Sequence, residues 1–165
     1  MSPAIAIGMK YVELKENVKM TYIPFQSGTE SVTALVGGHT QMCIVSSSEV
    51  LAFLQSKEVR GLAAVSEERW SFMPEVPTTK ELGYDIDITG WMGFGTPAGV
   101  PKERLEILFK AFKDAHQNPE VKATFEKLGL SAPYITGEEL KKIYQKRGVE
   151  WKPLLEALKA DQTKK

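Results

Sequence analysis

The stretch Val18-Lys-Met-Thr-Tyr-Ile-Pro-Phe-Gln-Ser-Gly-Thr-Glu-Ser-Val-Thr-Ala-Leu-Val-Gly-Gly-His-Thr-Gln-Met-Cys-Ile-Val45 decides the fold class. Its first six residues alternate apolar and polar, which is the period of a β-strand, until Pro24 ends the pattern. Apolar residues at helical spacing follow as far as Gly37-Gly38, a pair that favours a helix end. Residues 41–45 are a short apolar run, so the stretch predicts strand, helix and strand.

The same alternation extends to both sides of this stretch. Upstream, Ser2-Pro3 is a cap followed by proline at a first helical position, and predicts a helix from Pro3 to about Glu16. Downstream, Ser46 and Glu49 have capping-box spacing and predict the next helix. Residues 60–65 form another apolar strand pattern. Alternating helices and strands indicate an α/β unit with a parallel sheet.

A loop over residues 67–87 interrupts this pattern and predicts a boundary between a first part, 1–89, and a second part, 90–165. The second part opens with a strand pattern at Trp91 that runs into a Gly/Pro turn. Three helices are then expected, and they begin near Pro101, Asn118-Pro119 and Thr136. The second part should therefore be mainly helical.

Composition indicates a soluble globular protein. Of the 165 residues, 42% are hydrophobic and 25% are charged, and 21 basic residues balance 21 acidic ones. A net charge of zero argues against nucleic acid or an anionic membrane as a partner. No apolar stretch approaches the roughly 20 residues of a membrane helix, and no signal peptide is expected in the chain. The single cysteine, Cys43, excludes an internal disulfide.

Motifs for catalysis, metals and cofactors are absent. Ser46 to Ser48 lie outside a G-x-S-x-G elbow, and the only histidines are His39, in a Gly-Gly turn, and His116, near a helix end. Neither H-E-x-x-H nor C-x-x-C occurs, and Gly37-Gly38 does not match a phosphate loop. We therefore expect no catalytic residue, no metal and no cofactor, and an enzyme is the least favoured alternative.

Three helix starts carry the most informative chemistry, and they are Ser2-Pro3, Ser27-Gly28-Thr29 and Ser46-Ser47-Ser48. Each supplies backbone N–H donors, hydroxyl groups and the positive end of a helix dipole. Capping alone explains any one of them, but three at the carboxyl edge of a parallel sheet favour a site for a carboxylate or phosphate. Trp91, beside Gly90 at the crossing between the two parts, either lines such a cleft or belongs to the core.

The ordered motifs together resemble the Bug-type receptors of tripartite tricarboxylate transporters. The segments that carry this resemblance follow one another along nearly the whole chain: Ser2-Pro3, Ile23-Pro-Phe-Gln-Ser-Gly28, Ala34-Leu-Val-Gly-Gly38, Val59-Arg-Gly-Leu-Ala-Ala-Val65, Pro74-Glu-Val-Pro-Thr78, Trp91-x-Gly93 and Thr96-Pro-Ala-Gly-Val-Pro101. The resemblance implies an extracytoplasmic or periplasmic receptor that captures small carboxylates and delivers them to membrane transporter subunits.

The resemblance also implies a fold and a set of site residues. The fold would be that of a type II periplasmic binding protein, with 1–89 as most of lobe two, 90–165 as the returning helical part of lobe one, and the family's first half missing. Ser2 falls at a turn that holds a ligand carboxylate, and Ser46 stands where many members carry an acid. The second ligand loop, usually with Tyr-Lys-Gly, would comprise Phe25, Gln26, Ser27, Gly28 and Thr29.

Two functional expectations follow. The leading one is a binding module in which helix N-termini replace water around the oxygens of a small carboxylate. The alternative is a folded fragment that binds no ligand and covers its unpaired sheet edge and apolar residues in a swapped homodimer. The apolar residues that would need such cover are Phe109, Phe112, Phe125 and Trp151.

Overall fold

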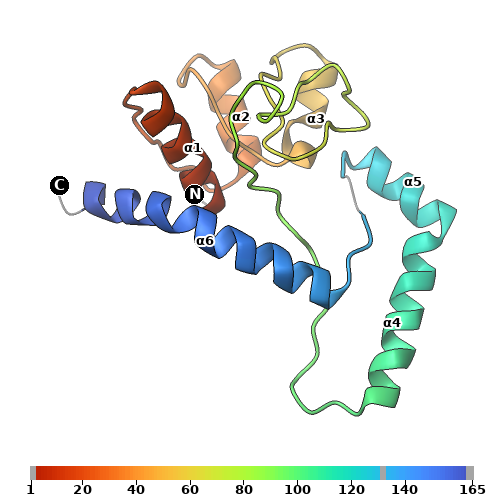
Figure 1. Ribbon diagram of the computed structural model, residues 1–165. Coiled ribbons are helices and arrows are strands. Elements are labelled where there is room, and N and C mark those ends of the chain that lie inside the picture. The colour runs from red at the N-terminus through yellow and green to blue at the C-terminus, as the bar shows by residue number, and fades with distance from the viewer. Residues whose placement is uncertain (1–2, 131–132, 163–165) are drawn as a thin grey trace.

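Six helices make up the regular structure of the computed structural model, which describes residues 3–130 and 133–162 (Figure 1). They are α1 (Pro3–Glu16), α2 (Gly28–Val36), α3 (Ser47–Gln55), α4 (Lys102–Gln117), α5 (Pro119–Lys127) and α6 (Gly137–Gln162). Each lies where the sequence predicts a helix. The reason is local capping: the Asn118 side chain accepts from the Glu120 N–H at the start of α5, and the Thr136 N–H donates to Glu139 at the start of α6.

The predicted strands are wrong for the part of the chain that the structure describes. Residues 18–23, 41–45, 60–65 and those after Trp91 contain no β-strand. A strand requires a ladder of backbone hydrogen bonds to a neighbour, and here only a single parallel bridge forms, between Ala64 and Thr78. The Ala64 N–H donates to the Pro77 carbonyl (2.8 Å), and the Thr79 N–H donates to the Ala64 carbonyl (2.9 Å).

Two separate apolar clusters form the core. The first cluster consists of Ile7 from α1, Leu154 from α6, and Ile86 from the chain between α3 and α4. Half-buried Trp151 packs against it. Because α6 comes from the second predicted part and α1 from the first, this cluster joins them, as Figure 1 shows where α6 runs along α1. The division into 1–89 and 90–165 stays a prediction.

The second cluster joins α2 and α3. It is built from Val32, Val50 and Leu54, and half-buried Cys43 and Trp70 pack against it. Burying side chains of this size contributes about 1.5–3 kcal/mol each. This cluster holds the N-termini of the two helices together, which positions the candidate site.

Helices α4 and α5 meet at an angle and project to one side of the molecule (Figure 1). Neither helix buries a residue, and Phe109 is 58% exposed. Phe112 stacks on Phe94 with ring centroids 4.0 Å apart. Of the expected apolar patch, Trp151 is therefore covered by the first cluster, whereas Phe109 is not.

None of the helices in the described ranges is long and apolar enough to cross a membrane.

Candidate functional site

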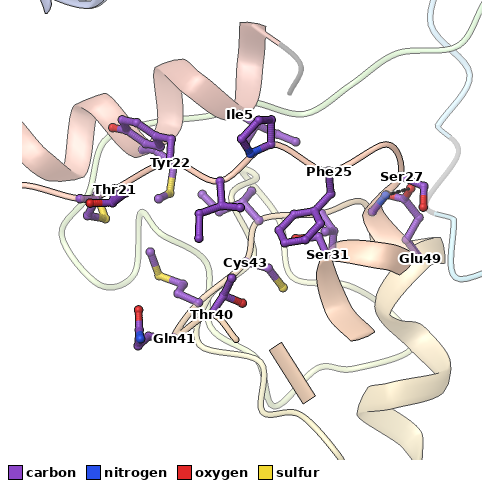
Figure 2. Close-up of a pocket in the computed structure, with 18 of the residues that line it drawn as sticks. Ile5, Thr21, Tyr22, Phe25, Ser27, Ser31, Thr40, Gln41, Cys43 and Glu49 are labelled. Atoms are coloured by element: carbon purple, nitrogen blue, oxygen red, sulfur yellow. Dashed lines mark hydrogen bonds between the residues drawn. The ribbon is translucent and has the colours of Figure 1, made fainter. Parts of the chain in front are cut away.

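A cavity of about 900 Å³ lies between α1, α2 and two extended segments, residues 19–26 and 40–46 (Figure 2). The residues predicted from the sequence that line it are Phe25, Gln26, Ser27, Gly28 and Ser46. They come from the loops that lead into α2 and α3, so one end of the cavity is formed by two helix N-termini.

Helix α2 begins at this end of the cavity. Ser27 is its cap, because the Ser27 hydroxyl accepts from the Glu30 N–H (3.2 Å). The Gln26 N–H donates to the Glu30 carboxylate (2.9 Å), which fixes the chain on entry to the helix. The short polar sequence before Gly28 thus stops the preceding extended segment and starts the helix.

The side chain of Glu49 links the start of α2 to the start of α3. Its carboxylate accepts from the Gly28 N–H (2.9 Å), the Ser46 N–H (3.1 Å) and the Ser46 hydroxyl (2.6 Å). The Ser46 hydroxyl, followed by the backbone donors, holds the pKa of Glu49 below its usual range, so the group stays ionised at neutral pH. Two helix N-termini therefore already bind one carboxylate, which belongs to the chain itself.

Gly28 allows this approach because it has no side chain. A Cβ at position 28 would lie 2.2 Å from a carboxylate oxygen of Glu49. From the sequence, Glu49 was predicted only as the capping-box partner of Ser46. Its reach to α2, 21 residues away, depends on the packing of α2 against α3, which no local pattern shows.

Further donors remain at the two helix ends. Within the described residues, the backbone N–H groups of Thr29, Ser47 and Ser48 have no acceptor. First-turn N–H groups of this kind carry the positive end of the helix dipole. None of these three residues is among those that line the cavity.

The remaining predicted site residues lie elsewhere. Thr29 is exposed, and neither it nor Trp91 is among the residues that line the cavity. Trp91 is half-buried, and its indole Nε1 has no hydrogen-bond partner among the described residues. Ser2 lies outside the described residues.

Sequence reasoning missed the residues along the extended walls. Lys19, Thr21, Gln41 and Cys43 line the cavity, and burial raises the pKa of the Cys43 thiol. The alternating pattern around Lys19 and the apolar run around Cys43 were interpreted as strands inside a sheet, so no cavity was expected there. In residues 3–130 and 133–162 no group of His, Cys, Asp and Glu side chains is arranged to hold a metal ion.

A family model described as the tripartite tricarboxylate transporter family receptor matches residues 2–160. The chain is 29% identical over 131 residues to a Cupriavidus necator protein called "UPF0065 protein in gbd 5'region", with 79% of this chain and 40% of that protein covered. It is 27% identical over 128 residues to protein BugT of Bordetella pertussis, with 77% and 39% covered. The chain spans less than half the length of these relatives.

Solved structures show the same fold. A TctC solute-binding protein from Polaromonas, without ligand, superposes with a TM-score of 0.77 at 28% identity, over 92% of this chain and 53% of that one. The Rhodopseudomonas palustris protein Rpa4515 with adipate gives 0.77 at 17% identity, over 93% and 52%. MatC from the same organism with bound malate gives 0.70 at 22% identity, over 93% and 53%.

Proposed function

The chain belongs to the tripartite tricarboxylate transporter receptor family, and from this membership we propose that it binds a small carboxylate at the N-termini of α2 and α3. The proteins it resembles are solute-binding receptors, two of them described with the dicarboxylates adipate and malate. A dicarboxylate is therefore the first ligand class to test.

One observation supports the location above all others: the Glu49 carboxylate is held by donors from both helix starts. A carboxylate of a ligand at this place would meet the same Gly28 and Ser46 donors. Charge-assisted hydrogen bonds of this type are about twice as strong as neutral ones. The ligand would replace the Glu49 side chain at these donors.

The ligand would occupy only one end of the cavity. Lys19, the basic residue of the lining, precedes Ser27 by eight residues of largely extended chain, roughly 25 Å at the rise of a strand. A small dicarboxylate is far shorter, so Lys19 would not contact it. Phe25 and Gln26 would supply the wall nearest to the bound carboxylate.

Family membership also supports a role in uptake. The chain would deliver its ligand to membrane subunits of a tripartite transporter, outside the cytoplasmic membrane. Catalysis would play no part, because binding and release alone serve such a receptor.

Calorimetry with malate, adipate and citrate tests the proposal. We expect saturable binding of at least one acid, weakened about tenfold or more by Ser27→Ala, which removes a hydroxyl at the start of α2. Thr33→Ala is the matched control, because Thr33 lies on the same helix outside the cavity lining and should leave affinity unchanged. Equal loss in both variants, or no binding by the wild-type chain, would count against a site at these helix ends.

A further inference from the structure

The Glu49 carboxylate occupies the donors at which the ligand is proposed to bind. It accepts from the N–H groups of Gly28 and Ser46 and from the Ser46 hydroxyl. Figure 2 shows the side chain reaching from α3 to the start of α2, next to Ser27. In the chain alone these donors are therefore filled by a group with the same chemistry as a ligand carboxylate.

Only hydrogen bonds hold this carboxylate in place. Among the described residues Glu49 forms no ion pair, unlike Glu81, which pairs with Arg69. Its negative charge is compensated by the N–H groups and dipoles of two helix starts, as the charge of a bound anion would be. A ligand carboxylate is thus able to take over every hydrogen bond that the Glu49 side chain accepts.

The Glu49 side chain also lies where it is able to leave these donors. Ser27 and Ser46 are exposed, and Glu49 itself is only half-buried. The Glu49 N–H donates to the Ser46 carbonyl (3.1 Å), so the backbone of the first turn of α3 is held independently of the carboxylate. Rotation of the side chain would therefore carry the carboxylate into solvent without unwinding the helix. The donors would then be open to a ligand.

We propose that Glu49 is an autoinhibitory side chain, which occupies the carboxylate position at the starts of α2 and α3 until a ligand displaces it. The inference rests on the proposed function, because it concerns the same donors. The apparent affinity for a ligand is then lowered by the fraction of chains in which Glu49 has left them.

Such a competitor would also select among ligands. Because Glu49 is tethered next to its donors, it competes at an effective concentration that is roughly millimolar or higher. A simple monocarboxylate such as acetate offers the same single group and gains nothing over it. A dicarboxylate or tricarboxylate carries a further polar group, whose contacts add to those of the displaced side chain. Glu49 would thus exclude monocarboxylates from the site.

Calorimetry with malate on the full chain and its Glu49→Ala variant tests the competition. We expect the variant to bind malate about tenfold more tightly, because its donors are open. Glu30→Ala is the matched control: it removes the same charge from the start of α2, where Glu30 accepts from the Gln26 N–H, and leaves Glu49 on its donors. It should not produce this gain. Equal gains in the two variants would overturn the proposal, since loss of charge repulsion alone would explain them.

Acetate provides a second readout that does not depend on malate. Added to Glu49→Ala, it replaces the missing carboxylate and should raise the melting temperature by several degrees over sodium chloride of equal ionic strength. The wild-type chain should show no such difference, because its own carboxylate fills the position. This comparison remains informative if Glu49→Ala is less stable than the wild type.

The outcomes separate this inference from the proposed function. Malate binding by the wild-type chain that is equal or stronger than that of Glu49→Ala would overturn the inference and leave the proposed function in place. An equal effect of acetate on both chains would also overturn it. A selective effect of acetate on Glu49→Ala, without binding of malate, adipate or citrate by either chain, would support the occupied position and count against the proposed ligands.

Discussion

At the scale of single residues, Glu49 determines how the site is built. It is a capping residue for α3 and at the same time the carboxylate bound at the start of α2. Its dual contact depends on Gly28, whose missing Cβ leaves the space that the carboxylate fills. One side chain therefore couples two helices that are separated along the chain by an extended segment.

Replacing Glu49 with Ala should destabilise the chain by about 1–2 kcal/mol, since the Gly28 and Ser46 donors lose their acceptor. Urea denaturation at neutral pH measures this loss. Glu75→Ala is the matched control, because Glu75 is exposed and has no partner among the described residues. Equal midpoints for the two variants would contradict the coupling of α2 and α3 through Glu49.

The same bond makes stability depend on pH. The pKa of Glu49 is lowered in the folded chain, first by the Ser46 hydroxyl, so the unfolded chain binds this proton more readily. The contribution is complete above the ordinary pKa of a glutamate and is lost as the pH falls through the lowered folded value. Denaturation midpoints of wild type and Glu49→Ala, measured from neutral to acid pH, should converge at the acid end; a constant gap would contradict this.

At the scale of elements, the sequence predicted all six helices of the described residues, but the strands it predicted do not form in them. Caps such as Ser27 and Asn118 are local signals, because the side chain bonds within its own helix turn. Residues 41–45 have the composition of a strand, but the ladder depends on a neighbour that composition does not specify. Ser27 and Ser46 could be predicted as candidate site residues because helix caps are local signals. Lys19 and Cys43, which also line the cavity, carry no such signal and could not be predicted.

Arg147 links helix α6 to residues 87–89, which follow Ile86 of the first cluster along the chain. Arg147 is 6% exposed, and its guanidinium forms an ion pair with Asp87 and donates to the Thr89 carbonyl (2.6 Å). Arg147→Met should therefore cost about 3 kcal/mol of unfolding free energy, because Asp87 loses its counter-charge. Adding Asp87→Asn to that variant should recover part of the loss, as a double-mutant cycle would show. A double mutant that is additive would contradict a direct pairing.

At the scale of the whole molecule, the core is divided and the α4–α5 pair lies outside it. The two clusters hold α1 with α6 and α2 with α3, whereas α4 and α5 bury no residue. Exposed Phe94 (83%) and Ile107 (68%) belong to this outer region. A homodimer that covers these residues stays a prediction, and a monodisperse monomer on size exclusion would contradict it.

A hydrogen bond anchors the α4–α5 pair to the start of α3: the Ser47 hydroxyl donates to the carbonyl of Gly129 (2.5 Å), which follows α5. A neutral bond of this kind contributes about 1 kcal/mol, so Ser47→Ala should increase local opening of the α4–α5 pair about fivefold. Limited proteolysis and hydrogen exchange over residues 102–130 measure the change. Ser48→Ala is the control, since the Ser48 hydroxyl lies near only the Ser46 hydroxyl and makes no contact with Gly129. If both variants open the α4–α5 pair equally, the Ser47 hydroxyl is not its anchor.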